Sequence, residues 1–88
     1  MVFRLSGDVQ VRKESWGLLF YAQTQHRIFF VRSGDWLYPQ YFDGTWTYDR
    51  LVEDIAKRTK TTTNLIERTL RKLTDNLLKN GMIVHELC

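Results

Sequence analysis

The hydrophobic pattern of this chain changes its period near the middle, and this change limits the folds that the chain can adopt. Apolar and polar residues alternate along residues 9–12, and two short runs rich in aromatic and branched residues follow at 17–21 and 27–31. Residues 22–26 form a polar segment of hairpin-loop length between these runs. After residue 47 the apolar residues recur every three or four positions, as they do along one side of a helix. This order predicts an α+β fold, winged-helix-like, in which a three-stranded antiparallel sheet is followed by three helices.

A short helix is expected directly after the third strand. Ser33 can cap this helix at its N-terminus. Trp36, Leu37 and Tyr41 would then face the core. Pro39 has no backbone N–H, so it would remove a helical hydrogen bond if it lay beyond the first turn.

Two longer helices are expected after the short one. Thr47 is a suitable N-cap for the first of them, which should end near residues 58–60. Asn64 and Glu67 form a variant of the capping box for the last helix, and Gly81 is expected at its C-terminal cap. The expected apolar stripes are Tyr48, Leu51, Val52, Ile55 and Ala56 in the first and Ile66, Leu70, Leu73 and Leu77 in the last.

A tight polar turn, Asp43-Gly44, precedes the longer helices. Glycine adopts positive φ without steric cost, and the aspartate can bond to nearby backbone amides, so the pair is expected to reverse the chain sharply. Phe42 and Trp46 flank the turn, and both are expected to pack on the core. We interpret the turn as a structural corner rather than as a ligand site.

The composition fits one soluble domain that spans residues 1–88. Hydrophobic residues make up 43% of the chain, which is far from the signature of disorder, and no apolar run approaches the roughly 18 residues of a membrane span. The start of the chain lacks a signal-peptide pattern, and the only cysteine is Cys88, so we expect a cytoplasmic protein without a disulfide framework. The net charge of +3 is spread along the chain, which disfavours a nucleic-acid partner.

Several motifs follow one another in a characteristic order along residues 9–84. Three strands are followed by Asp43-Gly44-x-x-Thr47, Leu51-Val52-x-x-Ile55-Ala56 and Leu77-x-x-x-Gly81-Met82-Ile83. In this order the chain resembles the PqqD family. Its members are small peptide chaperones, also called RiPP recognition elements, that bind the leader of a ribosomal precursor peptide and present it to a maturase, often a radical S-adenosylmethionine (SAM) enzyme.

Two details refine this resemblance. The stretch 9–21 is similar to stand-alone members found beside radical SAM enzymes, including the chaperone of mycofactocin systems. Thr74 departs from the family pattern, which commonly has a second apolar residue after the one that matches Leu73. The departure leaves the packing of the last helix open at that point.

The resemblance implies that a leader peptide binds as an extra strand beside the third strand, against the last helix. An edge strand with free backbone groups is otherwise an aggregation hazard, and a bound peptide removes it. Arg27 and Arg32 either keep the strand soluble or meet acidic leader side chains. The alternative is a strand with one face under the helices and the other in a homodimer. The candidate peptide-binding residues of this strand are Arg27, Ile28, Phe29, Phe30, Val31 and Arg32.

The last helix supplies the other candidate residues for peptide binding. Leu78 lies about 100° round the helix from Leu77, on the same side as Arg71. Leu78 is expected to be an apolar wall of the cleft and Arg71 its charged rim, although a single leucine off the stripe is often a scattered surface residue. The residues further round that complete the set are Arg68, Lys72 and Asp75, which commonly form only a solvated face.

No pattern in the sequence indicates catalysis, a cofactor or a metal. His26 and His85 lie far apart in the sequence, and the tail 85–88 offers too few ligands for a structural zinc site or an iron-sulfur cluster. A glycine-rich phosphate loop and a nucleophile with a placed base are also absent from the sequence. We therefore expect no enzymatic activity of its own.

Two other functions stay open at this point. A winged-helix DNA-binding transcriptional regulator uses similar parts, and the last helix carries basic residues, although Asp75 lies among them and Arg71 is turned away. A structural dimer would pair its own edge strands, with Ser33-Gly34 as a hinge for domain swapping.

Overall fold

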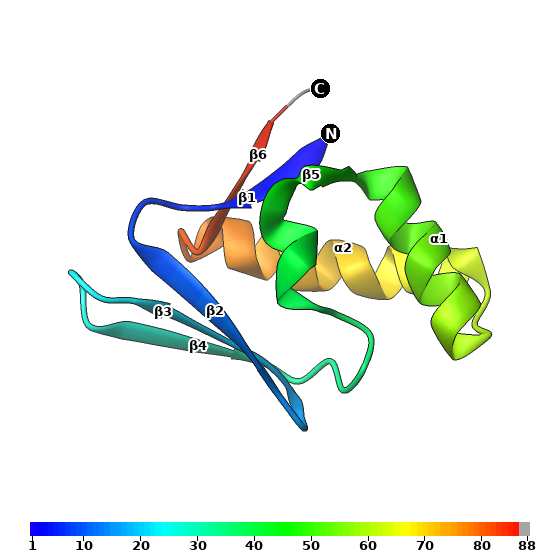
Figure 1. Cartoon of the computed structure of the whole chain (residues 1–88), viewed down its shortest axis with the longest axis horizontal. Coiled ribbons are helices and arrows are strands. Elements are labelled where there is room, and N and C mark those ends of the chain that lie inside the picture. The colour runs from blue at the N-terminus through cyan, green and yellow to red at the C-terminus, as the bar shows by residue number, and fades with distance from the viewer. Residues whose placement is uncertain (87–88) are drawn as a thin grey trace.

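Residues 1–86 fold into two three-stranded antiparallel sheets and two α-helices, so the predicted α+β class is confirmed (Figure 1). The computed structural model describes residues 1–86. The predictions of three helices and of a single sheet are wrong. The elements are β1 (Val2–Leu5), β2 (Val9–Glu14), β3 (Gly17–Ala22), β4 (Arg27–Val31), the 3-10 helix η1 (Pro39–Phe42), β5 (Asp43–Thr47), α1 (Tyr48–Thr59), α2 (Thr63–Lys79) and β6 (Ile83–Glu86).

The predicted three-stranded meander is one of the two sheets, with the strand order β2-β3-β4. Leu18 lies opposite Val31 and Phe20 opposite Phe29, and these side chains form the inner face of the sheet. The pairs on the other side of the pleat point away from the core. One face of this sheet is therefore buried, as the period-two pattern predicts.

The second sheet, with the order β5-β1-β6, is missing from the sequence-based prediction. Strand β1 pairs with β5 on one side and with β6 on the other, so residues from both ends of the described chain meet here. Each of these strands has only four or five residues, and none has its partner nearby in the sequence. Such short strands carry too little periodicity to be recognised alone.

The Asp43-Gly44 turn opens strand β5 instead of reversing the chain between two helices. Asp43 Oδ1 accepts a hydrogen bond of 2.9 Å from the backbone N–H of Thr45, and Gly44 has a φ of +86°. The predicted bond from the aspartate to a backbone amide and the predicted positive φ of the glycine are therefore confirmed. The chain nevertheless continues as a strand, because β1 offers these residues a pairing partner.

The prediction of a short helix that begins at Ser33 is also wrong. The chain forms a 3-10 helix of four residues, and Pro39 occupies its start. Pro39 has no N–H to donate to a preceding turn, so the helix begins at this residue and not at Ser33. Leu37 and Tyr41 are buried and Trp36 is partly buried, as predicted.

The two α-helices have caps of different quality. The Thr47 hydroxyl accepts a hydrogen bond of 3.3 Å from the N–H of Arg50, so the predicted N-cap of α1 is confirmed. The prediction of a capping box for α2 is wrong, because the helix begins at Thr63 and places Asn64 inside the first turn. At its other end, Gly81 has a φ of +72°, as its predicted capping role requires. Residue 82 donates to the carbonyl of residue 77, which completes a Schellman cap.

The core lies between the two sheets and the helices, and α2 supplies its central stripe. Ile66, Leu70 and Leu77 are fully buried, whereas Leu73 is only partly so. Thr74 takes the buried place beside them and is 4% exposed. Its hydroxyl donates a hydrogen bond of 2.9 Å to the carbonyl of Leu70, so a polar side chain is tolerated in the core.

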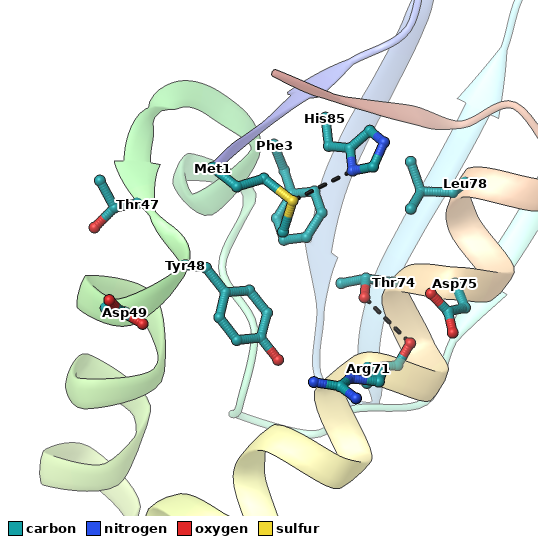
Figure 2. Close-up of a pocket in the computed structure, with 10 residues that line it drawn as sticks. All are labelled: Met1, Phe3, Thr47, Tyr48, Asp49, Arg71, Thr74, Asp75, Leu78 and His85. Carbon is teal, nitrogen blue, oxygen red and sulfur yellow. Dashed lines mark hydrogen bonds between the residues drawn. The ribbon is translucent and has the colours of Figure 1, made fainter. Parts of the chain in front are cut away.

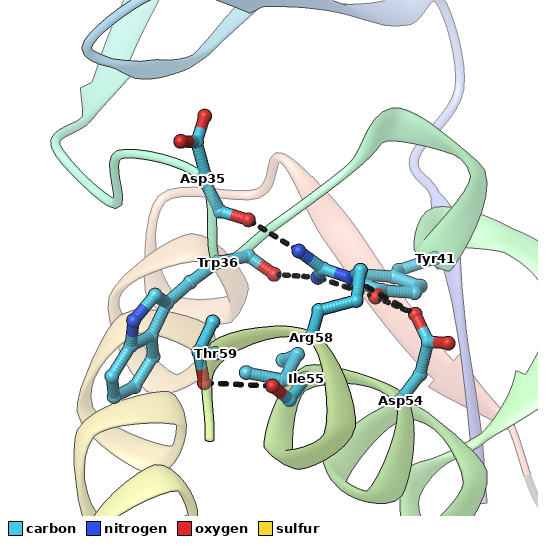
Figure 3. A network of polar contacts seen from close by, with 7 residues as sticks. All are labelled: Asp35, Trp36, Tyr41, Asp54, Ile55, Arg58 and Thr59. Carbon is cyan, nitrogen blue, oxygen red and sulfur yellow. Dashed lines mark hydrogen bonds and ion pairs between the residues drawn. The ribbon is translucent and has the colours of Figure 1, made fainter. Parts of the chain in front are cut away.

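A polar network ties the segment before η1 to helix α1 (Figure 3). The Arg58 guanidinium donates to the carbonyls of Asp35 and Trp36, each at 2.6 Å, and to the Tyr41 hydroxyl at 2.7 Å. The Tyr41 hydroxyl in turn donates to the Asp54 carboxylate. Burial raises the pKa of Tyr41 to about 12, and the bond from Tyr41 lowers the pKa of Asp54.

We expect Tyr41→Phe to lower the free energy of unfolding by at least about 1 kcal/mol at neutral pH, because it removes the hydrogen bonds of the hydroxyl with the Asp54 carboxylate and the Arg58 guanidinium. The lowered pKa of Asp54 means that the unfolded state binds the proton more readily. Wild-type stability should therefore fall as the pH drops below about 4. Urea unfolding at several pH values measures both effects, with Tyr38→Phe as the control. An equal acid-dependent loss in wild type and Tyr41→Phe would contradict this coupling.

We expect Gly17→Ala to lower the free energy of unfolding by at least about 2 kcal/mol. A Cβ atom at Gly17 would lie 1.9 Å from the carbonyl oxygen of Val31, and the φ of Gly17 is +148°. Gly34→Ala is the control, because Gly34 also has positive φ but open space around its Cβ position. Thermal and urea unfolding give the two losses. A loss no larger than that of the control would contradict the close approach of β3 to the end of β4.

Candidate functional site

Strand β4 forms an edge of its sheet and exposes large apolar side chains. It pairs with β3 on one side, and within residues 1–86 no strand pairs with its other side. Ile28 is 61% exposed and Phe30 is 62% exposed, whereas Phe29 is partly buried and Val31 is buried. Apolar side chains therefore lie on both faces of this strand. Its outward face is uncovered in the single chain.

The exposed side chains of β4 continue across β3 as one apolar surface. Leu19 lies opposite Phe30, and Tyr21 lies opposite Ile28. The Trp16 ring, in the turn between β2 and β3, is centred 5.5 Å from the ring of Phe30. We call this surface the outer face, and it consists of Trp16, Leu19, Tyr21, Ile28 and Phe30. Its first three members are not among the residues predicted from the sequence, because only tertiary contacts with Phe30 and Ile28 bring them beside β4.

Arg27 is the first residue of β4, and Arg32 directly follows its last residue, Val31. Arg27 Nη2 donates a hydrogen bond of 3.4 Å to Oδ1 of Asn80 at the C-terminal cap of α2. Arg32 lines a small hollow of about 210 Å³ together with Trp16 and Phe30. Neither arginine takes part in an ion pair within the described part of the chain. Both cations are therefore available to an external anion.

The other sheet edges differ from β4 in their side chains. On β2, Arg12 and Glu14 form an ion pair at 2.6 Å along the strand. On β6, Glu86 pairs with Arg4 at 2.9 Å, and the most exposed apolar residue is Val84 at 40%. Edge strands are commonly protected by such charges. The β4 edge has its charges only at its ends and aromatic and aliphatic residues between them.

Helix α2 presents two flanks, and the predicted site residues divide between them. Arg71, Asp75 and Leu78 line a pocket of about 520 Å³ that is closed on the other side by Phe3 and Tyr48 (Figure 2). This pocket faces β1, β6 and the start of α1. It has no β4 residue in its lining.

The C-terminal cap of α2 contacts β4 on the opposite side of the helix from this pocket, through Asn80 and Arg27. Asn80, which contacts Arg27, shares this flank with Leu73 and Thr69 by helical spacing. A long shallow hollow of about 1070 Å³ runs along the exposed side of α2, where Arg68 and Lys72 lie beside the partly exposed Leu73. The structure thus brings the β4 residues together as one group, whereas Arg71 and Asp75 line both the pocket with Leu78 and the hollow with Arg68 and Lys72. None of these three hollows is lined by both β4 and α2.

The Tyr48 hydroxyl points into the pocket of about 520 Å³, beside Arg71 (Figure 2). Its oxygen is buried and makes no hydrogen bond within residues 1–86. Burial raises the pKa of Tyr48, the nearby Glu67 carboxylate adds to this rise, and Arg71 opposes it. This phenol therefore stays neutral near pH 7.

The structure places the two histidines on different elements. His26 is in the β3–β4 loop, and His85 is on β6 with its Nδ1 3.2 Å from the Met1 sulfur. Cys88, the other metal ligand considered from the tail, lies outside the described residues. Among residues 1–86 no three His, Asp or Glu side chains are grouped closely enough to hold a metal ion. None of the described helices combines the length and apolar character that are needed to cross a bilayer.

We expect Tyr48→Phe to leave the protein as stable as the wild type or to stabilise it by about 1 kcal/mol, because the change removes a buried hydroxyl that has no partner within residues 1–86. Urea unfolding at pH 7 measures the difference. Tyr41→Phe serves as the contrast, since the Tyr41 hydroxyl has two partners. A clear loss of stability in Tyr48→Phe would reveal a partner of this hydroxyl in solution.

The chain matches no protein-family model, no curated protein and no solved structure. The resemblance to the PqqD family therefore rests on the order of the motifs in the sequence alone. Its functional implications stay predictions, and the geometry of β4 and α2 is the physical basis for assigning a function to this chain.

Proposed function

We propose that this protein is a peptide chaperone that binds the leader of a ribosomally made precursor peptide as an extra strand on β4. The observation that carries the proposal is an open edge strand whose Ile28 and Phe30 are 61% and 62% exposed. Large apolar groups on an unpaired edge are costly for a protein that stays monomeric, because they invite association. A bound strand forms hydrogen bonds with the free backbone groups of β4 and covers these exposed side chains.

Strand addition explains how a chain of this size gains affinity without a deep pocket. Backbone hydrogen bonds to β4 supply part of the affinity, and side-chain contacts on the two faces of the extended sheet supply the specificity. A micromolar complex needs only about 8 kcal/mol. The outer face and the partly buried Phe29 provide apolar contact on both sides of such a strand.

In this proposal α2 forms the wall that faces the bound peptide. Because Arg27 contacts Asn80, the flank of α2 that carries Thr69 and Leu73 is the side that would form this wall. Leu78 lines only the pocket on the opposite flank, so it has no direct part in peptide binding in this proposal, whereas Arg71 and Asp75 also line the hollow beside Leu73. This revises the assignment that the sequence suggested for the last helix.

The chemistry in this proposal belongs to a partner enzyme. The family resemblance implies a radical SAM maturase that acts on the core of the precursor while the chaperone holds its leader. Binding along the β4 edge leaves the remainder of the precursor free to extend to the enzyme. The chain itself then needs no cofactor.

A winged-helix DNA-binding regulator is the second candidate, and one observation favours it. Helices α1 and α2 are joined by residues 60–62, a connection of the length found in helix-turn-helix motifs. The exposed side of α2 carries Arg68 and Lys72, but Glu67 and Asp75 lie on exposed positions of the same helix. Mixed charge weakens contact with phosphate groups, so we prefer the peptide function.

The first test of the proposal is an NMR titration of the isotopically labelled protein. The probe is the leader half of a short open reading frame that lies beside the gene. We expect shift changes at residues 27–32 and on the Thr69–Leu73 side of α2, with little dependence on salt. A short DNA duplex is the contrasting probe. Salt-sensitive shifts on Arg68 and Lys72 with DNA, and none with the peptide, would replace the peptide function by the regulator function.

We expect Phe30→Glu to weaken leader binding at least about tenfold, which corresponds to about 1.4 kcal/mol, without loss of folding. The Phe30 side chain is mostly exposed, so the fold does not depend on it. Phe29→Glu is unsuitable, because Phe29 packs against the core. Val84→Glu, which changes an exposed apolar residue on the β6 edge, is the matched control and should bind normally. Calorimetry that finds equal affinities for Phe30→Glu and wild type would exclude β4 as the binding strand.

A further inference from the structure

We propose that the strand taken up by β4 belongs to one chemical class: an acidic peptide segment in which two alternate residues are apolar and an acidic residue stands at each end. This inference rests on the proposed function and narrows it. Three observations carry it, namely the outer face, the charges of Arg27 and Arg32, and the side of the sheet to which each of these residues points.

The outer face sets the apolar positions. A strand added to β4 places every second side chain on the same face as Ile28 and Phe30, within direct cross-strand contact of them. Two residues of the peptide, two positions apart, therefore extend the apolar surface that already runs from β3 to the open edge. A peptide shifted by one position would turn polar side chains onto this surface.

The two arginines set the acidic positions. They are five positions apart, or about 17 Å of extended chain. Residues 23–34 contain no aspartate or glutamate, so nothing in this segment neutralises them. Arg32 lines the hollow beside Phe30 and Trp16, on the outer face. Arg27 reaches the neutral Asn80 side chain on the α2 side.

The alternation of side chains between the two faces of a strand combines these positions into one sequence pattern for the peptide. A peptide residue opposite Arg32 lies on the same face as the residues opposite Phe30 and Ile28, whereas the residue opposite Arg27 lies on the other face. The bound segment therefore reads acidic, any, apolar, any, apolar, acidic. It reads in the reverse order if it runs in the opposite direction.

A second copy of the chain fits the same edge less well. If two β4 strands paired with each other, Arg27 and Arg32 of both copies would lie along one seam, and residues 23–34 would bring no carboxylate to it. Like charges that meet across strands are destabilising. The charge at this edge therefore favours an acidic peptide over self-association.

The test uses synthetic peptides in which a six-residue segment stands between Gly-Ser flanks. The matching peptide contains Glu-Thr-Ile-Thr-Val-Glu. One control has the same composition in the order Glu-Ile-Val-Thr-Thr-Glu, and another carries lysine in place of both glutamates. We expect the matching peptide to bind at least about tenfold more tightly than either control at moderate salt, with NMR shifts at residues 27–32.

Variants of the protein distinguish the contribution of charge to peptide binding from the contribution of apolar contact. Arg32→Gln should reduce the preference for glutamate over lysine at least about threefold, while the preference for the matching order over the permuted order remains. Arg12→Gln is the matched control, because Arg12 lies on the same sheet and already pairs with Glu14. It should leave both preferences unchanged. Analytical ultracentrifugation at two concentrations reports self-association.

The outcomes distinguish this inference from the proposed function. Equal binding of all three peptides at β4 would overturn the acidic and alternating pattern, while strand addition itself would stand. No shift at β4 with these peptides or with the leader would remove both. A stable dimer that excludes the peptides, or tighter binding of a single-stranded oligonucleotide to the outer face, would assign the surface to another partner.

Discussion

The burial of one face of α2 is the interaction on which the rest of this structure depends. Ile66, Leu70 and Leu77 are fully buried, and residues from both sheets belong to the same core. Figure 1 shows the helix passing between the two sheets. Each sheet has only three short strands, and such small sheets need a packing partner for stability. Because the core is made on one side of β2-β3-β4, the other side of that sheet is left to face outward.

Much of this architecture follows from local patterns that can be recognised in the sequence. The period-two runs predict the β2-β3-β4 meander, and Thr47 and Gly81 mark helix ends where the chain has them. The second sheet is missed because β1, β5 and β6 are short and their partners are distant in sequence. Pro39 restricts the expected helix to a single turn. Local propensity predicts the elements that nearby residues determine, and it misses those that only long-range pairing creates.

The candidate site shows the same limit. The alternation in RIFFV correctly indicates a strand with two apolar sides, but only the register with β3 identifies Leu19 and Tyr21 as neighbours of Phe30 and Ile28. The side to which each α2 residue points also depends on tertiary contact. Leu78 follows the helical spacing from Leu77, yet its position toward β1 and not β4 depends on how the whole helix is turned. Helical spacing fixes relative angles and leaves the absolute orientation to packing.

The pairing of β1 with β6 has a consequence for the order in which the protein folds. Val2 lies opposite Glu86, so this contact closes a loop of nearly the whole described chain. The β2-β3-β4 meander needs only short loops, and loop closure costs less entropy for near neighbours. We therefore expect the meander to form while the chain is still leaving the ribosome, whereas the second sheet waits for the last strand. The edge with the exposed aromatic residues would then exist before the molecule is complete, so the time spent in synthesis is also the time in which this edge is most open to wrong partners.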